Sequence, residues 1–499
     1  MEWTEDEIQR FGREVADLIA AYYVALETVP ISPRDPSKLD EIFGGPLPEE
    51  GTDPFALLEQ VRTKLLPNSF HLASPRYFGL FNPTPTVIGV FADAIASTIN
   101  QNMAAWSHGP AGSHIEKAVI RWLADLVGFG AQPSGTQPSV TQPSVTQPFG
   151  TQPFGTMTSG GSIANYSGLK VALNESIPGV RSEGVRAAAG RPVFYVSTQA
   201  HYSLDKTADM LGIGLEGRRL VECDADARII PQALEAKIAA DRAAGMIPFC
   251  VVGIAGTTTS GAIDPLDQLA AISARHRLWY HVDAAWGGAV RLSRRHRSLL
   301  DGIERADSVT LDPHKWFSVP YSAGAILTRD GAALRRTFEV KPHYVSDRIF
   351  AEHEDLNLFQ FGVAGSRRLD ALKVWLSLRN VGRRGYEEAV DRQLALAEYL
   401  AEKVASSPDL EAMSRPSLGV FCFRLVPPAL RGKHDELDAL QMRIQSAVER
   451  KGRAWISTSV LGGRRVIRFC ATSYLSRERH VDLMLDEVRA AAEAGSRPA

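Results

Sequence analysis

The sequence predicts an α/β protein in which helices cover a mostly parallel β-sheet. The first observation is that short apolar runs alternate with helical segments between residues 192 and 328. The second is that these runs are continuously apolar, which is typical of strands buried on both faces. The third is the length of 499 residues, which leaves room for a large domain and a smaller one.

Residues 1–85 are expected to form an N-terminal helical arm and linker, because prolines gather between Pro30 and Pro67. The segment SHIEKAVIRWLADLVG then predicts an amphipathic helix, with Ser113 and Glu116 at capping-box spacing and Gly128 at its end. Residues 131–155 repeat Gln-Pro five times. Proline removes a backbone donor at each repeat, so we expect a surface insertion without a catalytic role.

A large domain is expected over residues 86–375. Its predicted strands are the apolar runs at residues 192–197, 248–255, 278–282, 307–311 and 324–328. Residues 376–499 alternate helices with fewer strand-like runs, which predicts a small C-terminal α+β domain.

Composition and charge favour a small-molecule partner. The 55 Lys+Arg and 57 Asp+Glu residues are interspersed, so we expect binding neither to nucleic acid nor to a membrane. The four cysteines lie far apart and no HExxH motif occurs, so no metal site is expected. The N-terminus lacks an apolar signal segment, and we expect a cytoplasmic protein.

One glycine motif is discarded. Gly212, Gly214 and Gly217 match GxGxxG, but a helical segment precedes them and a strand-like run (RRLVEC) follows. A dinucleotide site needs the opposite order, strand before helix.

Several polar residues follow predicted strands directly, where α/β sheets bind ligands. They are His201, Thr258, Asp283, His314 and Lys315. The segment TMTSGGSIAN adds a Gly-Gly-Ser turn before a helix, which suits a phosphate. Each residue alone is also explained as a cap, a turn residue or a core histidine. Together they fit pyridoxal phosphate, since a carboxylate keeps the ring nitrogen protonated and an amine forms a Schiff base with the aldehyde.

The chain resembles the group II pyridoxal-phosphate decarboxylases over nearly its whole length. The motifs are SPRYFGLFNPTP, WSHGPAGSHIEKAVIRWL, TSGGSIAN, AHYSLDKTA, GTTTSGAIDPL, HVDAAWGG, DPHKWFSVPYSAG and GSRRLDALKVW, in the family's order. The resemblance implies a fold-type-I, aspartate-aminotransferase-like architecture with a seven-stranded type of sheet. It also implies a homodimer with shared active sites.

The resemblance also implies roles for individual residues. Lys315 would be the Schiff-base lysine and Asp283 the partner of the ring nitrogen, with His201 and Ala285 on the two ring faces. The remaining implied cofactor and proton-transfer residues are Gly161, Ser162, Thr258, Asp312 and His314. Two positions depart from the family pattern: Ile163 replaces a Glu, and Asp312 stands where animal enzymes have Asn.

The family returns a proton to Cα from a loop tyrosine about thirty residues after the lysine. Tyr344, twenty-nine residues after Lys315, matches that position and favours amine formation. Relatives with Phe there oxidise the substrate to an aldehyde, so oxidative decarboxylation is one alternative. A loop tyrosine without chemistry and a non-catalytic scaffold are two others.

The substrate is expected to be an aromatic amino acid of the tyrosine, dihydroxyphenylalanine, phenylalanine or tryptophan type. The residues that resemble the family's side-chain pocket are Tyr77, Phe78, Leu80, Phe81, Pro83, Trp106 and Ser366. Aromatic residues are more often core than pocket, and an arginine in the wall would suit glutamate or aspartate instead. Arg76 and Arg348 keep that acidic alternative open.

Overall fold

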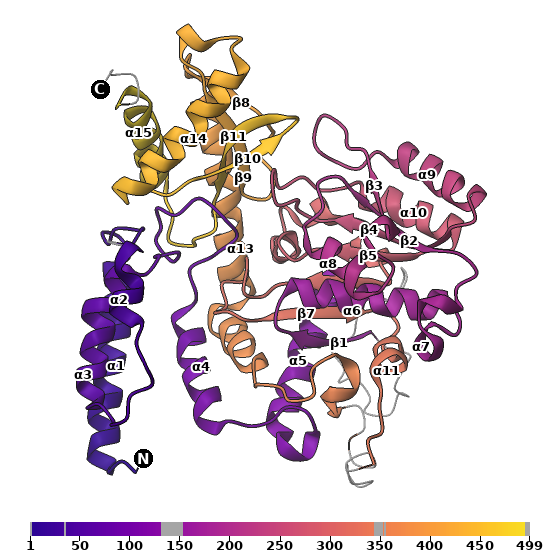
Figure 1. Ribbon diagram of the computed structural model, residues 1–499, viewed down its shortest axis with the longest axis horizontal. Helices are drawn as coiled ribbons and strands as arrows, with labels where there is room; N and C mark the ends of the chain where they lie inside the picture. The colour runs from indigo at the N-terminus through magenta and orange to yellow at the C-terminus, as the bar shows by residue number, and fades with distance from the viewer. Residues whose placement is uncertain (1, 34–35, 131–152, 344–352, 354–355, 495–499) are drawn as a thin grey trace. The chain divides into compact units, whose positions relative to one another are not determined.

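The computed structural model describes residues 2–33, 36–130, 153–343, 353 and 356–494. Most of the Gln-Pro repeat, Tyr344 and Arg348 lie outside these residues. The chain forms two compact units (Figure 1). The small unit comprises Met1–Thr84, Glu398–Met413 and Cys422–Ala499, and the large unit comprises Pro85–Ala397 and Ser414–Phe421. The sequence predicted a separate N-terminal arm over residues 1–85. In the structure, residues 1–84 belong to the same compact unit as the C-terminal segments.

A seven-stranded sheet forms the centre of the large unit, in the order β1-β7-β6-β5-β4-β2-β3. Its strands are β1 (Phe154–Thr158), β2 (Pro192–Ser197), β3 (Arg218–Val221), β4 (Ile247–Ile254), β5 (Trp279–Asp283), β6 (Ser308–Leu311) and β7 (Gly324–Thr328). Strands β2 to β6 pair in parallel, whereas β7 is antiparallel to both β1 and β6. All five apolar runs predicted as strands are strands. The strand-like run that follows the GxGxxG match is β3. Strand β1 was not predicted.

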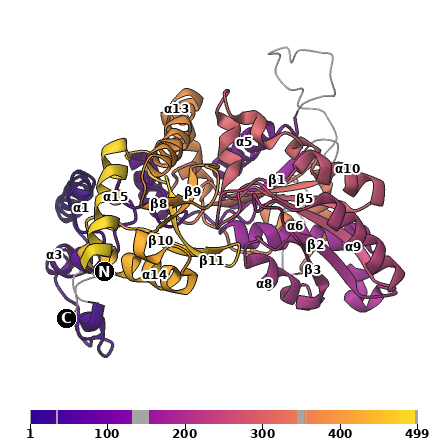
Figure 2. The same cartoon turned by 90° about the horizontal axis from the view of Figure 1, so that it is seen from above.

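Helices lie on both faces of this sheet. Figure 2 shows α5 and α10 on one face and α6 and α8 on the other. The helices of the large unit are α4 (Val87–Ile99), α5 (Pro110–Val127), α6 (Gly161–Ser176), α7 (Val180–Glu183), α8 (Ser203–Met210), α9 (Pro231–Ala243), α10 (Leu266–His276), α11 (Ala332–Phe338) and most of α13 (Ala371–Ala405). Helix α6 approaches β5 closely, since a Cβ at Gly168 would lie 2.7 Å from His281 Cε1.

The predicted capping box of α5 is wrong. The helix begins at Pro110, where proline suits the first turn, so Ser113 and Glu116 are buried inside it. Glu116 Oε1 instead accepts hydrogen bonds from Thr156 Oγ1 (3.0 Å), Met157 N (2.9 Å) and Arg367 Nη2 (2.7 Å). The predicted end is confirmed, because Gly128 caps α5 with a φ of 88°.

The small unit contains α1 (Glu5–Ala25), α2 (Leu39–Phe43), α3 (Pro54–Gln60), α14 (His434–Lys451) and α15 (Glu478–Ala494). Its four-stranded sheet has the order β10-β11-β9-β8. The strands are β8 (Leu410–Ala412), β9 (Val420–Leu425), β10 (Ser457–Leu461) and β11 (Arg464–Cys470). This α+β content agrees with the sequence. Within the described ranges, no helix combines the length and the apolarity needed to cross a membrane.

Candidate active site

Several strand ends meet at one edge of the large sheet. Ile254, at the end of β4, pairs with Asp283 at the end of β5, and Asp283 pairs with Thr310 of β6. Strand β7 runs in the opposite direction, so its first residue, Gly324, lies opposite Thr158, the last residue of β1. The loops that follow β1, β4, β5 and β6 are therefore brought together. The sequence predicted this for the loops after β4, β5 and β6, from the polar residues at these strand ends.

Lys315 lies in the turn after β6, beside two other polar side chains of that turn. Its Nζ is 3.1 Å from Asp312 Oδ2, and His314 Nε2 is 3.7 Å from the same oxygen. Lys315 N donates to Asp312 O (2.8 Å), which fixes the turn. The Asp312 side chain is 2% exposed and that of Lys315 is 22% exposed. The amine is therefore held near a buried carboxylate and is still accessible.

The orientation of His314 follows from one backbone hydrogen bond. Ala323 N donates to His314 Nδ1 (3.0 Å), so Nδ1 is an acceptor and the ring proton lies on Nε2, toward Asp312. Burial lowers the pKa of His314, although Asp312 opposes that effect. The neutral ring therefore presents an N–H donor to the site.

The Gly160–Gly161 turn leaves open the space at the N-terminus of α6. A Cβ at Gly161 would lie 2.6 Å from Asp312 Oδ2 and 3.2 Å from Ala285 Cβ, so a larger residue would fill this space. Ser162 follows in the first turn and is exposed. Asp312 Oδ1 is buried and has no hydrogen-bond partner in the described part of the chain. Free helix amides, an amine and carboxylates are the groups that pyridoxal phosphate needs, so these residues fit that cofactor.

Asp283 is the end of a directed chain of hydrogen bonds. Asn165 Nδ2 donates to Asp283 Oδ2 (2.8 Å), and the Ala285 amide donates to Oδ1 (3.1 Å). Asn165 Oδ1 lies 3.1 Å from His281 Nε2, and His281 Nδ1 lies 2.8 Å from Ser308 Oγ.

The donors in this chain are fixed at its Asp283 end. Asn165 Nδ2 donates to the carboxylate, so Asn165 Oδ1, which can only accept, faces His281 Nε2, and Nε2 carries the ring proton. His281 Nδ1 then accepts from the Ser308 hydroxyl, whose oxygen also accepts from Trp279 Nε1 (2.8 Å). Burial lowers the pKa of His281 to about 4, so the ring is neutral at pH 7 and the chain keeps this direction.

The other predicted cofactor residues lie at the same edge of the sheet. Burial lowers the pKa of His201, and the charges that act on it include those of Asp283, Lys315 and Asp312. Its Nδ1 accepts from Ser203 N (3.3 Å), so Nε2 carries the proton. Thr258 lies in the turn after β4.

The predicted substrate-pocket residues divide between the units. In the small unit, Tyr77 stacks on Trp455 with ring centroids 4.9 Å apart, and Phe78 stacks on Phe469 at 4.8 Å. Phe81 and Pro83 are also buried there, and Leu80 is exposed.

In the large unit, Trp106 N donates to Asn357 Oδ1 (3.1 Å), and the Trp106 ring lies 4.0 Å from that of His353. Ser366 is exposed.

Asn165 and His281 were not predicted from the sequence as site residues. A signal for His281 was present, because residues two apart in a strand face the same side and His281 is two before Asp283. No comparable signal exists for Asn165, whose role depends on how closely α6 packs on β5.

Residues 36–426 match the family model of the pyridoxal-dependent decarboxylase conserved domain. The chain belongs to the pyridoxal-dependent decarboxylase family. An aromatic-L-amino-acid decarboxylase from Bacillus atrophaeus is 31% identical over 494 residues, which cover 99% of this chain and 97% of that protein. A cysteine sulfinic acid decarboxylase from Mus musculus is 32% identical over 91% of this chain and 89% of its own length.

Solved structures of decarboxylases have the same fold. The Oryza sativa TDC with PLP and tryptamine has a TM-score of 0.89 at 25% identity, over 100% of both chains. Mouse CSAD has a TM-score of 0.88 at 29% identity, over 98% of this chain and 99% of its own. This decarboxylase is accordingly a fold-type-I carboxy-lyase that uses pyridoxal phosphate to decarboxylate an amino acid.

Proposed function

We propose that this decarboxylase converts an aromatic L-amino acid into its amine and carbon dioxide. The observation that carries the proposal is the position of Arg76, the described candidate for binding an acidic side chain. Its guanidinium is buried in the small unit, where it donates to the backbone oxygens of Arg453 (2.9 Å) and Val29. An arginine committed to two carbonyls is a poor partner for a substrate carboxylate. The 31% identity to an aromatic-amino-acid decarboxylase supports the same choice.

Pyridoxal phosphate, when bound, supplies a protonated ring that takes up the electron pair left at Cα when carbon dioxide departs. Asp283 would hold the proton at the ring nitrogen, while Asn165 holds the Asp283 carboxylate in place. Lys315 would supply the amine for the aldehyde of the cofactor. Gly161 and Ser162 would hold the phosphate at the start of α6, and His201 would cover the ring.

Tyr344 is proposed to return a proton to Cα, which yields the amine rather than an aldehyde. The assignment depends on its position in the sequence, twenty-nine residues after Lys315, in a segment rich in polar residues.

A second candidate is the decarboxylation of an acidic amino acid. The cysteine sulfinic acid decarboxylase at 32% identity favours it. Arg348 would then bind the acidic group in place of Arg76.

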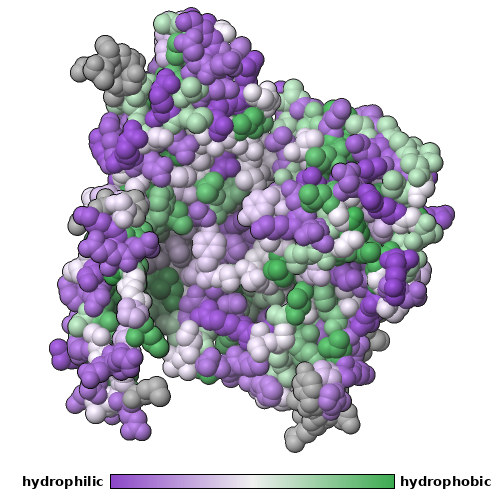
Figure 3. Space-filling view, in the orientation of Figure 1, coloured by the Kyte–Doolittle hydropathy of each residue, from purple (hydrophilic) through white to green (hydrophobic). Residues whose placement is uncertain are grey.

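We also propose a cytoplasmic homodimer that shares its active sites. Helix α4 supports a second copy as the partner, since it exposes an apolar residue at every fourth position. These are Val87, Phe91, Ile95 and Ile99, each 40–50% exposed. Figure 3 shows apolar surface in the region where Figure 1 draws α4. Such a stripe is typical of a helix face that another chain covers.

A panel of substrates tests the proposed function. Purified holoenzyme would be assayed for carbon dioxide, amine and peroxide with tyrosine, dihydroxyphenylalanine, phenylalanine, tryptophan, glutamate, aspartate and cysteine sulfinate. Amine from an aromatic substrate without peroxide is expected. Turnover confined to glutamate, aspartate or cysteine sulfinate would establish the second candidate, and peroxide with aldehyde would establish oxidation. For the dimer, sedimentation should show a lower mass for Phe91→Glu/Ile95→Glu than for wild type.

A further inference from the structure

A pocket of about 420 Å³ lies in the large unit among residues that the decarboxylation does not use. Its walls come from the second half of α5, from residues 291–297, from Phe317 and from α13. This volume lies within the range of small-molecule sites.

Hydrogen bonds between its elements hold the walls in place. Ser293 Oγ donates to Asp391 (2.5 Å), and Arg294 N donates to Glu387 (2.7 Å), which fixes the 291–297 segment on α13. Tyr386, also on α13, donates from its hydroxyl to Phe317 O (2.9 Å). The pocket is therefore formed before any ligand arrives.

The inner wall is apolar and partly aromatic. Leu123, Leu292 and Phe317 are buried, while Trp122 and Leu126 are half-buried. An apolar wall that contains two aromatic rings favours a ligand with a flat apolar part.

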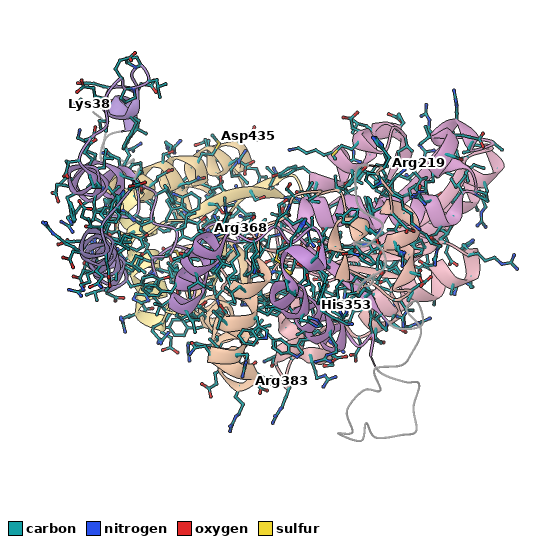
Figure 4. The ribbon with its side chains drawn as sticks, turned by 90° about the horizontal axis from the view of Figure 1, so that it is seen from below. Lys38, Arg219, His353, Arg368, Arg383 and Asp435 are labelled. Carbon is teal, nitrogen blue, oxygen red and sulfur yellow. The ribbon has the colours of Figure 1, made fainter. Side chains whose placement is uncertain are left out.

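The mouth of the pocket is cationic. Arg297, Arg379 and Arg383 line it and are exposed, and none of the carboxylates that the structure describes forms an ion pair with them. Asp125 is the one acidic residue in the lining. Arg383 lies inside α13 next to Gly382, and Figure 4 shows it on the outer side of that helix, which suits a place at the mouth.

The backbone of α13 is kinked beside these arginines. Gly382 has a φ of 67°, which interrupts the regular helix between Arg379 and Arg383.

We propose that this pocket is a second ligand site, which binds a small organic anion with an aromatic body. The aromatic body would lie against Trp122 and Phe317, and the anionic group would pair with Arg379 and Arg383. Arginine suits this arrangement because its planar group pairs with carboxylates, phosphates or sulfonates and also stacks on rings. The site is independent of the substrate assigned above.

The test is a fluorescence titration of the holoenzyme with 8-anilinonaphthalene-1-sulfonate, an aromatic anion. One saturable site is expected, and Arg379→Ala/Arg383→Ala should weaken it at least about tenfold. The matched control is Arg384→Ala, the neighbouring exposed arginine outside the lining, which should bind the probe as wild type does. Lys315→Ala should also bind it normally, which separates this pocket from the active site.

A second probe avoids any substitution. N-phenyl-1-naphthylamine has the same rings without the sulfonate, and it should bind wild type at least about tenfold more weakly. The proposal fails if both probes bind equally, or if the double variant binds the sulfonate as tightly as wild type. It also fails if wild type binds no probe and the double variant has a lower mass in sedimentation, because the pocket is then a contact between copies of the chain.

Discussion

The indole rings of Trp286 and Trp316 are stacked, with centroids 4.6 Å apart and an interplanar angle of 1°. Trp286 follows Asp283 by three residues, and Trp316 follows Lys315 directly. Each ring also donates a hydrogen bond, Trp286 to Leu418 O (3.0 Å) and Trp316 to Gln393 Oε1 (2.7 Å). The stack therefore joins the loop that carries the carboxylate to the turn that carries the amine.

This stack should contribute to the stability of the folded chain. Trp286→Phe and Trp316→Phe should each lower the free energy of unfolding, with a coupling energy of about 0.5–1.5 kcal/mol in a double-mutant cycle. The measurement is urea unfolding followed by far-UV circular dichroism. Trp3→Phe, at an exposed tryptophan of the small unit, is the control and should change little. Strictly additive effects of the two substitutions would show that the stack carries no coupling.

Replacing the lysine should abolish turnover. Lys315→Ala removes the amine, so we expect kcat to fall more than about 1,000-fold and the visible band of lysine-bound cofactor to disappear. Absorbance spectra and a carbon dioxide assay check this. Lys237→Ala, at an exposed lysine of α9, should leave both unchanged. Retention of the band in Lys315→Ala would assign the covalent bond to another amine.

The hydrogen bond from the Asn165 amide to the Asp283 carboxylate should strengthen cofactor binding. Asn165→Leu removes the donor to Asp283, and the loss of about 1.5–3 kcal/mol should weaken cofactor binding by about 10- to 100-fold. The readout is an absorbance titration of the apoprotein with pyridoxal phosphate. Asn174→Leu is the matched control on the same helix, because the Asn174 amide atoms are buried without a hydrogen-bond partner in the described part of the protein. If the two variants bind equally well, Asn165 does not position the carboxylate.

A methyl group at Gly161 should close the phosphate space. Gly161→Ala would bring its Cβ within 2.6 Å of Asp312 Oδ2, and we expect about 1–3 kcal/mol of lost cofactor affinity. Isothermal titration with pyridoxal phosphate measures it. Gly12→Ala has open space around it and should bind the cofactor like wild type. Unchanged affinity in Gly161→Ala would place the phosphate elsewhere.

His281 should make stability depend on pH. Its folded pKa of about 4 lies below the ordinary value of 6.5, so the unfolded chain binds more protons between these values. The free energy of unfolding therefore rises with pH from about 4 to 6.5, and acidification from pH 7 to pH 4 should remove about 3 kcal/mol through this residue.

Urea unfolding across this range, compared with His281→Gln, isolates the effect. The variant should have a flatter profile, and His434→Gln, at an exposed histidine of the small unit, should follow wild type. Parallel profiles for wild type and His281→Gln would contradict the expectation.

The sequence allowed the buried strands to be predicted because their runs are continuously apolar. It did not allow β1 to be predicted, since FGTMT is short, contains glycine and threonine, and pairs with β7, which is distant in the sequence. Ser113 and Glu116 match a capping box, but Pro110 starts the helix earlier and a tertiary partner, Arg367, binds the glutamate.

In the candidate site, the polar residues at the ends of strands could be predicted from the sequence. The hydrogen bond that holds Asp283 could not, because its donor, Asn165, lies on a helix 118 residues earlier in the chain.

The reversed direction of β7 also governs when this site can exist during synthesis. Among the described strands, β1 has β7 as its only neighbour in the sheet, so β1 has none of these strands to pair with until residues 324–328 have been made. The phosphate turn follows β1 directly, and β2 to β6 can assemble without it. A nascent chain that stops before β7 would hold most of the sheet but could not retain the cofactor. Cofactor loading is therefore expected to follow translation of the large unit rather than accompany it.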